Sequence, residues 1–105
     1  MRLRHASLLR NLPGIQKWGL LCCKSKGRLP AVWLHSICKS SWAVLHTIKR
    51  HGGRVEGVVI IEVEVPRRWL RRSHRKLWYC RRDIPVTRFR RLVAFTELAG
   101  TSAEP

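Results

Sequence analysis

The sequence predicts an α+β fold: a small single domain with a mostly antiparallel sheet and two short helices. Three observations predict it. Helical spacing is confined to the first half of the chain, strand-like runs dominate the second half, and a length of 105 residues suits one domain with a modest core. Because helices and strands are segregated, a doubly wound parallel sheet is disfavoured. We expect one domain over residues 1–99 and a flexible tail over residues 100–105.

The first helix is expected over residues 7–18, where leucine and isoleucine recur at helical spacing and Gly19 can end the helix. Pro13 is awkward inside such a helix. The alternative is a helix that begins near residues 11–12 and has this proline in its first turn, where no N–H is required.

The second helix is expected over residues 40–50. The hydroxyl of Ser40 or Ser41 can cap its first turn, and Gly52 and Gly53 can end it.

The clearest strand is VVIIEVEV at residues 58–65, which is rich in β-branched residues and bounded by Gly57 and Pro66. Its first half is apolar enough to be buried on both faces. Its second half alternates, which places Glu62 and Glu64 together on one face, to face solvent or pair with arginines. Further strands are expected over residues 31–34, 77–80 and 89–98, with an arginine-rich connector containing one helical turn over residues 66–76.

The formal net charge is +16, from 22 Lys and Arg against 6 Asp and Glu, and no acidic residue precedes Glu56. Such a chain attracts polyanions, so we expect a nucleic-acid partner. In the run RRWLRRSHRKLWYCRR, basic residues alternate with aromatic ones, which is typical of a single-strand platform; a solvated connector with inward tryptophans is an equal alternative. The expected nucleic-acid contacts in this run are Arg67, Arg68, Arg71, Arg72, Arg75, Lys76, Arg81 and Arg82.

The four cysteines lack the spacing of a zinc site, so no metal is expected. No stretch is long and apolar enough to span a bilayer, and no secretory signal is visible. We therefore expect a cytoplasmic protein with free thiols and without a membrane partner.

Five short motifs occur in the order found in one fold family. LRHAS at residues 3–7 resembles the histidine strand of the ADP-ribosyltransferase-like fold. NLPGIQKWGLL at residues 11–21 resembles the helix that follows this histidine in DarT-type DNA ADP-ribosyltransferases. The segments R…AVWLHS, KRHGGRVEGVVIIEVEVP and LWYCRRDIP are similar to consecutive segments of RNA 2′-phosphotransferases, which share the fold and consume NAD.

This resemblance implies an NAD-binding transferase that acts on or near nucleic acid. It implies that His5 orients the nicotinamide ribose and that Arg4 or Arg28 holds phosphate, with His5 and Arg28 as the catalytic pair. Ser7, Trp33 and His35 would complete the NAD site, Trp33 by stacking. The reaction would be attack on the ribose C1′ by a phosphate or base of the nucleic acid.

Two alternatives stay open. One is a catalytically inactive, basic nucleic-acid-binding module of the same fold. The other is a basic toxin or antitoxin partner that acts by protein contact. Of the remaining aromatic and titratable residues, we expect His46, His51 and His74 at the surface of helices or loops, and Trp18, Trp42, Trp69 and Trp78 in the core.

Overall fold

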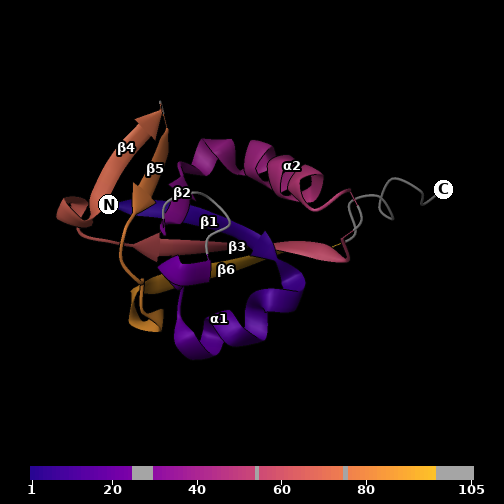
Figure 1. Ribbon diagram of the computed structural model, residues 1–105, viewed down its shortest axis with the longest axis horizontal. Coiled ribbons are helices and arrows are strands. Elements are labelled where there is room, and N and C mark those ends of the chain that lie inside the picture. The colour runs from indigo at the N-terminus through magenta and orange to yellow at the C-terminus, as the bar shows by residue number, and fades with distance from the viewer. Residues whose placement is uncertain (25–29, 54, 75, 97–105) are drawn as a thin grey trace.

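The computed structural model describes residues 1–24, 30–53, 55–74 and 76–96. Within these ranges, six strands form one antiparallel sheet in the order β4-β5-β2-β1-β3-β6, accompanied by two α-helices (Figure 1). The predicted α+β class and antiparallel sheet are therefore confirmed. The elements are β1 (Arg2–Leu8), α1 (Leu12–Trp18), β2 (Val32–His35), α2 (Ser40–Arg50), β3 (Gly57–Glu64), β4 (Leu70–His74), β5 (Leu77–Cys80) and β6 (Phe89–Thr96).

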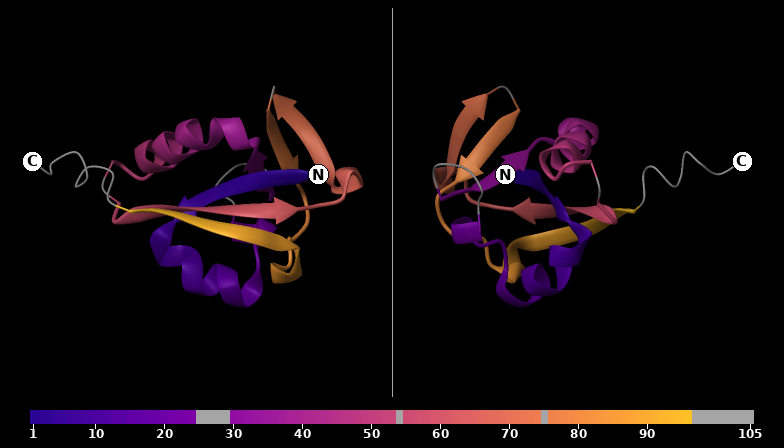
Figure 2. Two further views of the ribbon diagram at one scale, coloured as in Figure 1. Left: turned by 180° about the vertical axis from the view of Figure 1, so that it is seen from behind. Right: turned by 45° about the vertical axis from the view of Figure 1, so that its right-hand side comes forward.

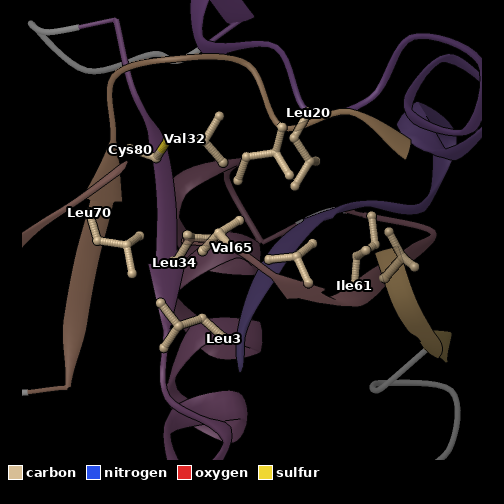
Figure 3. Packing of buried hydrophobic residues seen from close by; sticks show 11 residues of the cluster. Leu3, Leu20, Val32, Leu34, Ile61, Val65, Leu70 and Cys80 are labelled. Atoms are coloured by element: carbon tan, nitrogen blue, oxygen red, sulfur yellow. The ribbon is translucent and has the colours of Figure 1, made fainter. Parts of the chain in front are cut away.

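The two helices lie on opposite faces of the sheet (Figures 1 and 2). Alternation along β1 and β3 turns Leu3 and Ile61 toward α1, where they join the larger apolar cluster with Leu20, Leu34 and Ile84 (Figure 3). The opposite face of β3 packs on α2 in a smaller cluster. Each helix thus covers one face of the sheet, and residues 58–61 of β3 are apolar and buried on both faces.

Strand β3 is the centre of this arrangement. It pairs with β1 on one side and with β6 on the other, and its residues from Gly57 to Val63 are buried. The predicted strand at residues 58–65 is confirmed, as is the placement of Glu62 and Glu64 on one face. Both carboxylates pair with arginine, so the predicted pairing is confirmed as well.

Strands β1 and β2 pair only briefly. The ladder between β1 and β3 runs the length of β1, whereas the ladder between β1 and β2 contains a single pair, Arg4 with His35. Beyond that pair the two strands separate. All six strands therefore belong to one sheet, but β1 and β2 lack backbone pairing along most of their length.

The helix predictions are confirmed in part. Residues 7–8 belong to β1, because they pair with β3; α1 begins at Leu12 with Pro13 in its first turn, as the alternative predicted. The second helix spans residues 40–50 as expected, but the expected serine cap is wrong. Lys39 occupies the cap position without a side-chain bond, because a 3₁₀ turn runs directly into the helix.

The connector at residues 66–76 is also partly wrong. The expected helical turn exists at residues 67–69, but residues 70–74 form β4, an edge strand of the sheet. Burial of Leu70 in the core and pairing with β5 hold this arginine-rich segment in a strand. Residues 97–105, which include the predicted tail, lie outside the described residues.

Gly19 ends α1 in a backbone conformation with φ of 85° and ψ of −170°, a region that is essentially restricted to glycine. The following residue, Leu20, exchanges two backbone hydrogen bonds with Ile84, each 2.9 Å long. A Cβ at position 19 would lie 2.5 Å from the carbonyl oxygen of Ile84. Gly19 therefore allows the end of α1 to approach the segment before β6.

We expect Gly19→Ala to lower the free energy of unfolding by about 2–4 kcal/mol, because it combines a disfavoured φ with a backbone clash. The matched control is Gly14→Ala inside α1, where a Cβ would meet nothing within 4 Å. That change should stabilise the protein by up to about 1 kcal/mol. Urea denaturation of both variants measures the difference, and equal effects would contradict this role of Gly19.

Candidate functional site

A cleft of about 930 Å³ lies where β1 and β2 separate. Its walls are residues 5–8 of β1, residues 31–35 before and within β2, residues of α1 and α2, and residues 73, 74 and 77 of the β4–β5 hairpin. The volume is within the range of small-molecule and cofactor sites. The brief pairing of β1 with β2 thus leaves a cavity in the middle of the sheet.

The structure brings together four of the residues that the sequence predicts for NAD binding. His5, Ser7, Trp33 and His35 all line the cleft. Arg4 does not line it; its side chain is buried in an ion pair with Glu62. Arg28, the other predicted phosphate ligand and catalytic residue, lies outside the described residues.

His5 is held in one orientation by the backbone of the neighbouring strand. Its Nδ1 lies 2.7 Å from the carbonyl oxygen of Trp33. A carbonyl can only accept, so Nδ1 carries the proton and the neutral ring keeps Nε2 as an acceptor. Burial lowers the pKa of His5, and the bond to Trp33 opposes that shift. His5 thus spans the gap between β1 and β2 as a neutral imidazole.

His35 is also neutral at physiological pH. Burial, reinforced by the positive charges that His5 and Arg4 can carry, lowers the pKa of His35 to about 4. Its Nε2 lies 3.4 Å from the hydroxyl of Ser40. The centre of the cleft therefore presents two neutral imidazoles, one from each of the separating strands.

A buried ion pair lies beneath these histidines. Arg4 donates to Glu62 at 3.1 Å and to the hydroxyl of Ser40 at 3.2 Å, which joins β1 to β3 and to the start of α2. The side chains of Arg4 and Glu62 are 13% and 7% exposed. Because a buried charge without a partner is costly, this pair fixes the position of β1 beside the cleft.

Three of the five tryptophans are exposed at the cleft. Trp18 is 64% exposed, Trp33 40% and Trp42 44%, and all three line it. The ring of Trp42 stacks on His46 with the ring centroids 4.9 Å apart. The expected core position is wrong for Trp18 and Trp42, because α1 ends at Trp18 and α2 turns Trp42 away from its buried face.

The cleft is cationic. None of the described residues that line it is an acid. This charge was not predicted for the cleft, although the absence of acidic residues before Glu56 indicates it, because nearly every lining residue precedes that position. The cationic side chains of the lining are those of Arg10, Lys24 and Arg50. All five histidines of the chain also line the cleft, which adds His46, His51 and His74 to the residues predicted there.

The predicted nucleic-acid contacts gather on and beside the β4–β5 hairpin. Guanidinium groups lie over the rings of both tryptophans in this segment, so these rings are not open for bases to stack on. The guanidinium of Arg82 lies 4.0 Å from the ring centroid of Trp69, and that of Arg72 lies 5.2 Å from the ring centroid of Trp78. Both tryptophans pack against the core, as expected. The exposed basic residues are Arg67, Arg68, Arg71, Arg72, Lys76, Arg81 and Arg82, whereas Arg75 lies outside the described residues.

Comparisons with known proteins found no matching family model, no matching curated protein and no matching solved structure. In the ranges that the structure describes, no helix is long and apolar enough to cross a membrane, and no cluster of His, Cys, Asp and Glu could hold a metal ion.

The lowered pKa of His35 predicts a loss of stability in acid. In the unfolded state His35 has its ordinary pKa of 6.5, whereas in the folded state its pKa is about 4. Stability is therefore full above pH 6.5 and falls as the pH drops toward 4, by about 2 kcal/mol once solvent screening is allowed for.

Urea denaturation at a series of pH values measures this effect. In His35→Gln the slope of stability against pH should be shallower, whereas His74→Gln, at an exposed position of the hairpin, should keep the slope of the unchanged protein. Equal slopes for the unchanged protein and His35→Gln would show that the loss of stability in acid does not come from the lowered pKa of His35.

Proposed function

We propose that the cleft binds a phosphate-bearing nucleotide of the NAD class and that the protein acts on or near nucleic acid. The observation that carries the proposal is that His5, Ser7, Trp33 and His35, which the resemblance implies for NAD, line one cleft with a cationic, carboxylate-free wall. NAD combines a pyrophosphate, two riboses and two flat rings. Cations, neutral polar groups and exposed aromatic rings are the matching chemistry.

In this proposal the neutral groups take the ribose and the cations take the pyrophosphate. The Nε2 of His5 accepts from a ribose hydroxyl, since its Nδ1 is committed to Trp33. Arg10, Lys24 and Arg50 are the candidates for phosphate within the cleft. Arg4 does not line the cleft but supports it through its bonds to Glu62 and Ser40.

The transfer step in this proposal breaks the bond between C1′ and the nicotinamide nitrogen and forms a bond from C1′ to an oxygen of the acceptor. Neutral nicotinamide leaves with the electron pair. A nucleic-acid phosphate is already an anion at neutral pH, so it can attack without a general base. That acceptor suits a cleft in which none of the described lining residues is a carboxylate.

Calorimetric titration with NAD tests the proposal. The unchanged protein should give saturating heat, and His5→Asn should bind NAD about tenfold more weakly, because it loses one hydrogen bond to the ribose. Asparagine can keep a donor near the position of Nδ1 while it removes Nε2, so the strand contact to Trp33 is preserved. Thr87→Ala, at an exposed position that does not line the cleft, is the control. Saturation by ADP-ribose with the same dependence on His5 would support the site, and absence of heat with both ligands would overturn it.

A second candidate function is nucleic-acid binding by charge alone. The exposed basic residues of the β4–β5 hairpin favour it, because they form a dense cationic surface on one edge of the sheet. This function requires neither NAD nor His5.

Neutralising the hairpin tests this second function. Arg68→Gln with Arg81→Gln should weaken binding of an oligonucleotide and reduce the slope of log affinity against log salt by about 2. Arg90→Gln with Arg91→Gln removes the same charge from exposed positions of β6 and should leave the slope nearly unchanged. Equal losses in both pairs would show that total charge, rather than the hairpin, determines binding.

A further inference from the structure

The outer face of α2 is an apolar ridge. Trp42 and Leu45 are 44% and 63% exposed, while Ala43 and Val44 on the inner face are buried. At 3.6 residues per turn, Trp42 and Leu45 point within roughly 60° of each other, with Lys49 between them. Ile37, in the turn that leads into the helix, is 49% exposed. Half of the exposed large apolar residues of the described chain lie between residues 33 and 45.

Positive charge surrounds the ridge. No aspartate or glutamate occurs between residues 31 and 53. Lys39 precedes α2, and Lys49 and Arg50 form its last turn. A convex helix face with a tryptophan, aliphatic side chains and flanking lysines is the pattern of helices that lie in the interface of an anionic bilayer.

We propose that α2 docks this ridge on the surface of an anionic phospholipid bilayer. Ile37 and Leu45 enter the interfacial region beside Trp42, and the flanking cations meet the headgroups. A bilayer suits this face better than nucleic acid does, since Ile37 and Leu45 have no ring on which bases can stack. The docking is peripheral, so it does not require a membrane-spanning helix, and none is present in the described ranges. It differs from the expectation of no membrane partner.

This inference does not depend on the proposed function. Trp42 belongs both to the ridge and to the cleft lining, whereas Leu45 does not line the cleft, so changing Leu45 tests the ridge without changing a residue of the proposed nucleotide site. Leu92 on β6, 47% exposed, provides a matched leucine on another part of the surface. A test can therefore separate apolar insertion at α2 from the general attraction of a chain of charge +16 to anionic lipid.

The experiment is co-sedimentation with vesicles of phosphatidylcholine alone and with vesicles of equimolar phosphatidylcholine and phosphatidylglycerol, at low and at raised salt. The unchanged protein should bind the mixed vesicles and keep part of that binding at raised salt. Leu45→Asp should bind them about tenfold more weakly than Leu92→Asp, which carries the same charge change. Leu45→Ser and Leu92→Ser repeat the comparison without a new charge, and circular dichroism confirms that all four variants are folded.

Equal binding by the two aspartate variants would overturn the proposal, because charge alone would then explain the association. Failure of the unchanged protein to bind mixed vesicles would overturn the proposal as well. Binding of a single-stranded oligonucleotide by the same protein would then assign its positive charge to nucleic acid instead of to a bilayer. Quenching of Trp42 by brominated acyl chains, measured as the difference from Trp42→Phe, should accompany binding, and its absence would count against insertion.

Discussion

The structure depends on a single residue pair between β1 and β2. Arg4 opposite His35 joins the two strands, and beyond this pair they separate. The ion pair from Arg4 to Glu62 holds β1 against β3, so β1 cannot shift to close the gap. His5 spans part of that gap with a bond to the backbone of Trp33. The cleft exists because β1 is held against β3 and joined to β2 by one pair only, so that the two strands separate beyond this pair.

Neutral and cationic side chains occupy different parts of this opening. The neutral imidazoles of His5 and His35 lie at its centre, while Arg10 and Arg50 come from segments on opposite faces of the sheet. Burial favours the neutral form of both imidazoles, because the charged form loses solvation. A ligand that combines neutral hydroxyl groups with anionic groups suits this distribution of charge.

On the surface of the molecule, cationic side chains and tryptophans are arranged differently on the β4–β5 hairpin and on α2. The guanidinium of Arg82 covers Trp69 on the hairpin, so that tryptophan supports the basic surface instead of projecting from it. On α2 the arrangement is reversed, since Trp42 and Leu45 project and the cations flank them. The two basic surfaces are therefore suited to different polyanions: phosphates on the hairpin, and an anionic surface with an apolar interior at α2.

The sequence by itself determined the α+β class, β3, α2 and the strongly basic character, because these depend on local periodicity and composition. Pairing of Glu62 with arginine was one of the two alternatives that it offered for this residue, and the structure shows that pairing. The edge strand β4, the exposure of Trp18 and Trp42, and the gathering of five histidines at one cleft were decided only by the tertiary structure. Helical spacing cannot say whether a tryptophan faces a core or a cavity, since that depends on where the neighbouring strands lie. The opening between β1 and β2 is likewise a property of strand pairing, which brings together residues far apart in the chain.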